Sequence, residues 1–139
     1  MESCLGTVHE LHTELQKCKD ASFMWFGVVS ALKHMHDLEI MHGDIKATNL
    51  LVKSLQPERT PQIMLCDFGS AGKFGEKLGS FTPGYEAPHV KKGLCIKTPL
   101  QDMHGLALTL HDLNLTDHTM DGIKEFAKCC YQTAGQGVL

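Results

Sequence analysis

The feature that most constrains the fold is the stretch ASFMWFGVVSALKHMH at residues 21–36, which is apolar on most faces of a helix. Met24, Val28 and Leu32 recur at the spacing of one helical stripe, and other apolar side chains fill the neighbouring face. A helix that is apolar on most sides is a buried helix. The rest of the chain must therefore supply elements that cover it from several directions.

Further segments carry the apolar spacing of helices, namely residues 8–18, 102–113 and 121–131. The last of these is amphipathic, and its apolar side chains fall on one face: Ile123, Phe126, Ala127, Cys130 and Tyr131. Asp121 stands at the start of this face, where an N-cap residue is expected.

Short strands are predicted at Ile40–Met41, at 49–53 and at 63–66. The sequence QPERTP between the last two strands predicts a turn, because its prolines deny both helix and sheet pairing. Residues 69–84 are rich in glycine and lysine and are interpreted as a mobile loop. The predicted fold class is therefore mainly α with short β-hairpins.

Composition narrows the class of protein. A chain of 139 residues is expected to form one domain. Its net charge of −3 argues against nucleic acid or an acidic membrane as the main partner. The longest apolar block, FMWFGVVSAL, is shorter than a membrane span, and the opening residues do not resemble a signal peptide. The six cysteines lack metal-site spacing, which favours free thiols and a cytoplasmic location.

The polar residues that could take part in catalysis or metal binding cluster in HGDIKATN and, further on, in DFG. Phosphoryl transfer needs metal-held phosphates, a positioned hydroxyl and stabilisation of the developing charge. Asp44 can orient a hydroxyl, and Lys46 can neutralise a phosphate. Asn49 and Asp67 offer oxygen atoms of the kind that Mg²⁺ prefers. Each residue alone is better explained as a turn or cap residue, so the ordered set carries the information.

In this order the motifs resemble the C-terminal lobe of a eukaryotic protein kinase. HGDIKATNLLV resembles the catalytic loop H-R-D-x-K-x-x-N, and CDFGSAG resembles the magnesium-binding D-F-G. TPGYEAPHV resembles the segment that closes the activation loop, and DMHGLALTLHDL resembles the buried helix after it. MESCLGTVHELHTEL is similar to the hinge and the helix that follows. The resemblance is strong over residues 1–113 and weak over 121–131, and residues 132–139 are expected to fray.

A rival family has to be weighed, because HGD followed by an asparagine also resembles the small-molecule kinases that act on aminoglycosides or choline. Those enzymes lack a lysine two residues after the aspartate and lack the G-Y-x-A-P segment. This chain has Lys46 and the sequence GYEAP, which favours a protein kinase. Lys46 together with Thr82 is similar to the serine/threonine class rather than the tyrosine class.

The resemblance implies a role for each matching residue of the reaction centre. Asp44 would be the catalytic base and Lys46 the contact to the γ-phosphate of ATP. Thr82 would brace these two side chains. Asn49 and Asp67 would bind Mg²⁺ and, through it, the nucleotide.

The resemblance also implies how the adenine of ATP and the catalytic loop are held. Leu51 would form the apolar floor under adenine, and the backbones of Glu2 and Cys4 would meet the adenine edge at the hinge. Asp102 would tie the backbone of the catalytic loop to the helix beneath it.

The chain also departs from the family pattern. Gly43 replaces an arginine that binds an activation-loop phosphate, which argues against control through such a phosphate. His89 replaces a buried glutamate whose arginine partner is missing too, so no orphan charge remains. His104 and Gly105 stand where tryptophan and serine are usual. The Gly-rich loop, strand lysine and helix glutamate of the N-terminal lobe are not found in the sequence.

The unit of residues 1–139 is therefore expected to be a single, partial and truncated protein kinase domain. Its predicted function is that of a serine/threonine kinase, which transfers the γ-phosphate of ATP to protein Ser/Thr hydroxyls with Mg²⁺. Without an N-terminal lobe it is not expected to be active by itself. The alternative is a pseudokinase-like interaction module with weak or no ATP binding and a regulatory protein partner.

Overall fold

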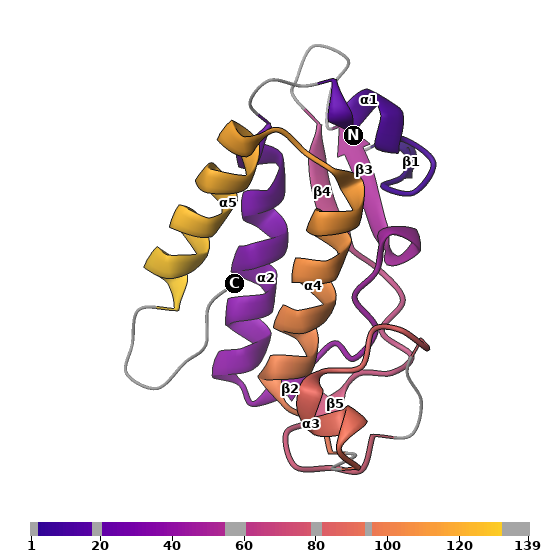
Figure 1. Cartoon of the computed structure of the whole chain (residues 1–139), viewed down its shortest axis with the longest axis vertical. Coiled ribbons are helices and arrows are strands. Elements are labelled where there is room, and N and C mark those ends of the chain that lie inside the picture. The colour runs from indigo at the N-terminus through magenta and orange to yellow at the C-terminus, as the bar shows by residue number, and fades with distance from the viewer. Residues whose placement is uncertain (1–2, 18–20, 55–60, 79–81, 94–95, 132–139) are drawn as a thin grey trace.

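Helices lie beside small antiparallel sheets in this molecule. The computed structural model describes residues 3–17, 21–54, 61–78, 82–93 and 96–131. The long helices lie side by side, with α2 between the other two (Figure 1), and are α2 (Phe26–Asp37), α4 (Pro99–Leu113) and α5 (Asp117–Cys130). The short helices are α1 (His12–Gln16), α3 (Pro88–Lys91) and the 3-10 helices η1 (Ser22–Trp25) and η2 (Ala47–Asn49).

Helix α2 lies at the centre of the hydrophobic core. Its Val28 and Leu32 are fully buried, and Trp25 of the preceding turn η1 is 1% exposed. Leu106 of α4 and Ile123 of α5 belong to the same buried cluster. A fully buried side chain of this size contributes about 1.5–3 kcal/mol through removal of apolar surface from water. The predicted buried helix over residues 21–36 is thus confirmed, with its first turn wound as a 3-10 helix.

The strands pair in antiparallel fashion and are β1 (Ser3–Thr7), β2 (Ile40–Met41), β3 (Leu50–Ser54), β4 (Gln62–Leu65) and β5 (Gly72–Lys73). One sheet has the order β1–β3–β4, and β2 pairs with β5 in the other. Val52 lies opposite Ile63 in the β3–β4 pair, and both are buried. Because side chains alternate along a strand, the same face of this sheet packs on the helices.

The ends of the long helices follow local capping rules. Helix α4 ends where Asn114 takes a left-handed conformation with a φ of 53°. Helix α5 begins at Asp117, because the Oγ1 atom of Thr116 caps it by accepting the backbone N–H of Thr119 at 3.2 Å. The predicted cap at Asp121 is therefore wrong, and the helix starts one turn earlier.

The prediction of a mainly α fold is corrected to a mixed α/β domain. About half of the described residues are helical, and short antiparallel strands make up a smaller share. The predicted loop over 69–84 contains strand β5. The sequence does not indicate this strand, because Gly72–Lys73 has no apolar alternation. The predicted helix over 8–18 shortens to His12–Gln16.

Most of the predicted QPERTP turn and the whole tail at 132–139 lie outside the described residues. No helix in the described part of the chain is both long and apolar enough to cross a membrane. Among the cysteines that the structure describes in full, Cys66, Cys129 and Cys130 form no disulfide.

Candidate active site

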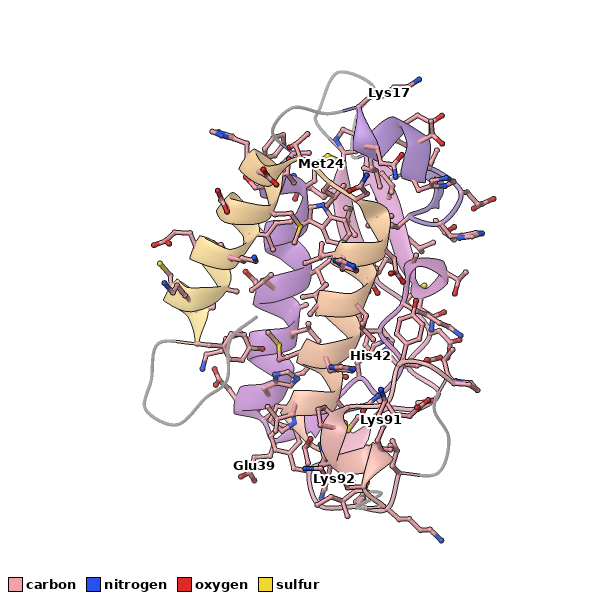
Figure 2. The ribbon with its side chains drawn as sticks, viewed as in Figure 1. Lys17, Met24, Glu39, His42, Lys91 and Lys92 are labelled. Carbon is pink, nitrogen blue, oxygen red and sulfur yellow. The ribbon has the colours of Figure 1, made fainter. Side chains whose placement is uncertain are left out.

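The loop of residues 42–49 connects β2 with β3 and is fixed to the buried carboxylate of Asp102 in α4. Asp102 is 1% exposed. Its oxygens accept hydrogen bonds from the backbone N–H groups of His42 and Gly43, each at 2.8 Å. Such bonds to an ionised carboxylate are among the stronger ones in proteins. Asp102 therefore ties the loop to the helix beneath it, as the resemblance implies, and Figure 2 shows His42 beside α4.

His42 joins this loop to the loop that contains Asp67. The His42 side chain is fully buried. Its Nε2 atom lies 2.8 Å from the carbonyl oxygen of Cys66, and its Nδ1 atom accepts the backbone N–H of Asp44 at 3.2 Å. The ring also contacts Phe68 edge to face, with 5.0 Å between ring centroids. Both ring nitrogens are thus used to hold backbone, which fixes the ring and both loops.

Asp44, Lys46 and Thr82 form one hydrogen-bonded group, although Thr82 follows Asp44 by 38 residues. Thr82 Oγ1 donates to Asp44 Oδ1 at 2.7 Å, and Lys46 Nζ donates to Thr82 Oγ1 at 2.9 Å. Lys46 Nζ also lies 3.6 Å from Asp44 Oδ2. These side chains are mostly shielded, so their charges are screened less than those of an exposed ion pair. The structure therefore brings the three predicted catalytic residues together in one partly buried group.

Asn49 closes the same loop from its other end. Its Nδ2 atom donates to the backbone oxygen of Asp44 at 2.9 Å and to Asp44 Oδ2 at 3.1 Å. Because the amide nitrogen is committed to Asp44, the amide oxygen is the atom left to bind a ligand. The backbone oxygen of Asn49 accepts the N–H of Cys66 at 3.0 Å, which places the residue before Asp67 next to Asn49.

Asp67 is held more loosely than the other predicted site residues. It is exposed, and its Oδ1 atom accepts the backbone N–H of Gly69 at 3.3 Å. Its φ of 58° is left-handed, a conformation that is uncommon outside glycine and concentrates at functional sites. The local bond to Gly69 helps a short polar side chain to adopt this strained conformation.

The donors at Asn49 and Asp67 fit Mg²⁺. One offers an amide oxygen and the other an exposed carboxylate, and Mg²⁺ binds oxygen ligands while it keeps waters or phosphate oxygens in its remaining positions. In the described part of the chain, no group of three His, Cys, Asp or Glu side chains is arranged to hold a metal by itself. A metal at this site would therefore take part of its coordination from a bound phosphate or from water.

Gly43 stands where the family pattern has arginine, and its backbone φ is 97°. A Cβ atom at this position would lie 2.5 Å from the backbone oxygen of Ser70. Side chains other than hydrogen are strained at this φ and are blocked by this contact. Gly43 therefore has a structural role of its own, besides removing the arginine that would contact a phosphate. It lets the loop of residues 66–71 pack directly on the loop of residues 42–49.

A second close approach fixes the other side of the loop of residues 42–49. A Cβ atom on Gly105 of α4 would lie 2.8 Å from the backbone oxygen of Ile45. The glycine thus allows the helix to lie against the loop backbone between Asp44 and Lys46. The departure from serine at this position has a structural reason in this chain.

Gln101 fixes the segment that contains Thr82, a role that no sequence motif indicates. Gln101 is 4% exposed. Its Nε2 donates to the carbonyl of Tyr85 at 3.0 Å, and its Oε1 accepts the N–H of Ala87 at 2.8 Å. His89 adds a weaker contact from Nε2 to Thr98 Oγ1 at 3.3 Å. The segment is therefore anchored to α4 without the ion pair that the family pattern would supply.

The residues predicted to meet adenine lie on neighbouring strands. Leu51 in β3 is partly buried and lies opposite Thr7 of β1. The backbone of Cys4 is in β1, opposite Lys53. Glu2 lies outside the described residues. Their contact with a nucleotide stays a prediction.

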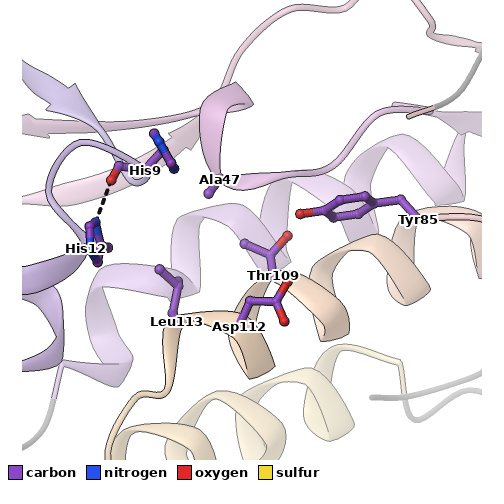
Figure 3. A pocket seen from close by; sticks show the side chains of 7 residues that line it. All are labelled: His9, His12, Ala47, Tyr85, Thr109, Asp112 and Leu113. Carbon is purple, nitrogen blue, oxygen red and sulfur yellow. Dashed lines mark hydrogen bonds between the residues drawn. The ribbon is translucent and has the colours of Figure 1, made fainter. Parts of the chain in front are cut away.

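A cavity of about 230 Å³ adjoins the loop of residues 42–49 (Figure 3). It is lined by His9, His12, Ala47, Tyr85, Thr109, Asp112 and Leu113. Burial and the nearby charge of Asp112 raise the pKa of the Tyr85 phenol above its ordinary value, so the hydroxyl keeps its proton at neutral pH. Ala47 follows Lys46 in the chain, so the cavity begins one residue from the candidate reaction centre.

Comparison with known proteins decides the family. A family model described as the protein kinase domain matches residues 1–134. The chain belongs to the protein kinase domain family. The predicted relationship to protein kinases is thereby confirmed at the level of the family.

Serine/threonine kinases and a MAP kinase kinase are among the related proteins. The MAP kinase kinase skh1/pek1 of Schizosaccharomyces pombe is 40% identical over 93 residues, which cover 65% of this chain and 24% of that protein. Serine/threonine-protein kinase D2 of Homo sapiens and of Mus musculus is 43% identical over 74 residues, which cover 49% of this chain and 8% of each relative. The chain thus aligns with a quarter or less of these relatives.

Proposed function

We propose that this member of the kinase family carries the phosphate-transfer centre of a protein serine/threonine kinase. The observation that carries the proposal is the hydrogen-bonded group of Asp44, Lys46 and Thr82, which the fold assembles from two separate segments. ATP would be the phosphate donor, a protein Ser/Thr hydroxyl the acceptor, and the cytoplasm the place of action. The serine/threonine relatives support this class of acceptor.

In this proposal Asp44 orients the acceptor hydroxyl and takes its proton. Its Oδ1 atom accepts a hydrogen bond from the Thr82 hydroxyl, and its Oδ2 atom contacts Asn49 and Lys46. The carboxylate therefore has little freedom to rotate. A fixed carboxylate is suited to accept a hydroxyl proton as the bond to phosphorus forms. The Lys46 ammonium lies beside it and would stabilise the negative charge on the transferred phosphoryl group.

The nucleotide side of the proposal rests on Asn49 and Asp67. Their oxygens would hold Mg²⁺, which supplies charge neutralisation at the phosphates of bound ATP. Leu51 and the backbones of Glu2 and Cys4 would contact adenine. The cavity beside Ala47 offers space for a residue of the protein substrate that neighbours the acceptor.

A pseudokinase-like binding module is the second candidate. The loose attachment of Asp67 favours it, since the carboxylate has a single long hydrogen bond among the contacts of the described residues. Such a module would bind ATP weakly or not at all and would serve a regulatory protein partner. Nucleotide binding and phosphate transfer distinguish the two candidates.

The test measures these two properties separately on the full-length protein and its Asp44→Asn variant. Binding of Mg-ATP is followed by thermal shift, and transfer of labelled γ-phosphate is followed on a Ser/Thr peptide library. We expect Asp44→Asn to keep ATP binding and to lower transfer by about 100-fold or more, the range that general acid–base catalysis contributes. Asn retains the shape of the side chain but cannot take the proton.

Asp37→Asn is the matched control. Asp37 is an exposed carboxylate at the end of α2, paired with Lys33 at 2.7 Å, and it is outside the group around Asp44. It should leave both properties unchanged. Transfer by Asp44→Asn at the wild-type rate would remove Asp44 from its role, and wild-type protein that neither binds ATP nor transfers phosphate would favour the second candidate.

A further inference from the structure

His36 of α2 is a buried histidine that links side chains from distant parts of the chain. Its Nε2 atom lies 2.9 Å from Asp102 Oδ2, and its Nδ1 atom lies 2.7 Å from the hydroxyl of Tyr131. The exposed fractions of His36, Asp102 and Tyr131 are 4%, 1% and 3%. A continuous line of buried polar groups therefore runs from the residue after α5, through α2, to the carboxylate that holds the catalytic loop.

The proton positions along this line follow from Asp102. Its carboxylate accepts the backbone N–H groups of His42 and Gly43, and an ionised carboxylate is an acceptor toward His36 as well. If the His36 ring carries a single proton and donates it from Nε2 to this carboxylate, Nδ1 is the acceptor for the Tyr131 hydroxyl. Burial and the charge of Asp102 raise the pKa of Tyr131 well above its ordinary value, so the hydroxyl keeps its proton.

Packing holds the two rings in place. The His36 ring contacts the rings of both Phe74 and Tyr131, with a centroid distance of 5.8 Å to each. The ammonium of Lys33 lies 5.5 Å from the centroid of the Tyr131 ring. These contacts keep the Tyr131 hydroxyl aimed at His36, although Tyr131 is 95 residues away along the chain.

We propose that Tyr131 is a positioning residue for the loop of residues 42–49 and acts on it through His36 and Asp102. The tyrosine hydroxyl keeps the proton of His36 on Nε2. His36 then completes the donors around Asp102, whose carboxylate stays oriented toward His42 and Gly43. The inference rests on the proposed function where it names this loop catalytic. Its test measures the order of the loop itself, so the result does not depend on whether phosphate is transferred.

The experiment removes the Tyr131 hydroxyl and keeps the ring, in the variant Tyr131→Phe. Backbone amide exchange is measured residue by residue by NMR. We expect exchange at His42 and Gly43 to speed up by about tenfold, the effect of losing one buried hydrogen bond, with a smaller change at Val52 in the sheet. The nitrogen spectrum of the His36 ring should show a neutral, Nε2-protonated tautomer in the wild type and a tautomer mixture in the variant.

Thr119→Val is the matched control because it lies on the same side of the molecule, in α5. Thr119 is 1% exposed, and its Oγ1 atom accepts the N–H of Ala21 at 3.0 Å. The control therefore also leaves a buried polar atom unpaired, the N–H of Ala21, and it removes the hydrogen bond from Thr116 Oγ1 at 3.0 Å. None of the described contacts of Thr119 reaches His36 or Asp102. It should lower thermal stability by a similar amount without selective exchange at His42 and Gly43.

Certain outcomes overturn the proposal. The proposal fails if amide exchange at Gly43 stays at the wild-type rate in Tyr131→Phe. It also fails if this exchange speeds up equally in Thr119→Val. Another such outcome is a wild-type His36 ring that is doubly protonated or protonated on Nδ1. The ring spectrum needs no variant, so the proposal can be overturned even if Tyr131→Phe does not fold.

Discussion

The loop of residues 42–49 and the loop of residues 66–71 meet in the candidate site but are held in different ways. The first is bound to buried groups, since Asp102 accepts the N–H groups of His42 and Gly43. In the second, Asp67 is exposed, strained and bonded at 3.3 Å to its own loop. We infer that the proton-accepting side of the site is fixed before any ligand binds, whereas the metal-binding side is completed by the metal and phosphates.

The strongest way to break this comparison is the variant Asp102→Ala. It leaves the N–H groups of His42 and Gly43, and Nε2 of His36, without their buried acceptor. We expect the free energy of unfolding, measured with urea, to fall by about 3–5 kcal/mol, the usual cost of removing one partner from a buried charged network. Asp112→Ala on the exposed side of the same helix should change it by no more than about 0.5 kcal/mol. Equal losses in both variants would show that Asp102 does not fix the loop.

An intermediate effect is expected from Gly43→Ala, which tests the contact between the two loops. Gly75 is the matched control, because its φ of 85° is close to the 97° of Gly43 but an added Cβ would meet no atom within 4 Å. Both variants should lose about 1–2 kcal/mol of stability from backbone strain. Gly43→Ala should lose about 1–3 kcal/mol more, because its Cβ overlaps the backbone oxygen of Ser70. Equal losses, measured by urea unfolding, would contradict the direct packing of the loops.

The smallest effect on stability is expected from Asp67→Asn, since an exposed carboxylate with one long bond contributes little to the folded state. The free energy of unfolding should change by no more than about 0.5 kcal/mol. The thermal shift produced by Mg-ATP should nevertheless shrink strongly, because the metal loses its charged ligand. Mg-ATP and ATP with a chelator are compared on both proteins. An undiminished Mg-ATP shift in the variant would remove Asp67 as a metal ligand.

Local sequence patterns predict much of the fold. The apolar run at 21–36 predicted the central helix, and the short apolar segments at 49–53 and 63–66 predicted strands, because these signals lie within a few residues of each other. The start of α5 was misplaced, since Asp121 and Thr116 are both good caps and packing selected the earlier one. Strand β5 was missed because its pairing partner, Ile40–Met41, lies about 30 residues away.

In the candidate site, too, some features are predicted from local sequence and others depend on contacts between distant residues. The motifs identified Asp44, Lys46 and Asn49 as a chemical group, and the protein kinase model confirms the family. Gln101 and Tyr131 belong to no motif, and a lone glutamine within a helix or tyrosine after one gives no signal of its partner. Their roles depend on contacts across 14 to 95 residues of chain.

The sequence by itself determined the family, the buried central helix and the residue types available for phosphate transfer, because motif order and local periodicity are properties of neighbouring residues. The tertiary structure decided how these residues are held. It selected Gly43 for a close contact with Ser70, placed Thr82 against Asp44, and joined Tyr131 to the loop of residues 42–49 through His36 and Asp102. The physical reason is that hydrogen bonds and packing depend on distances in space, which spacing along the chain does not specify.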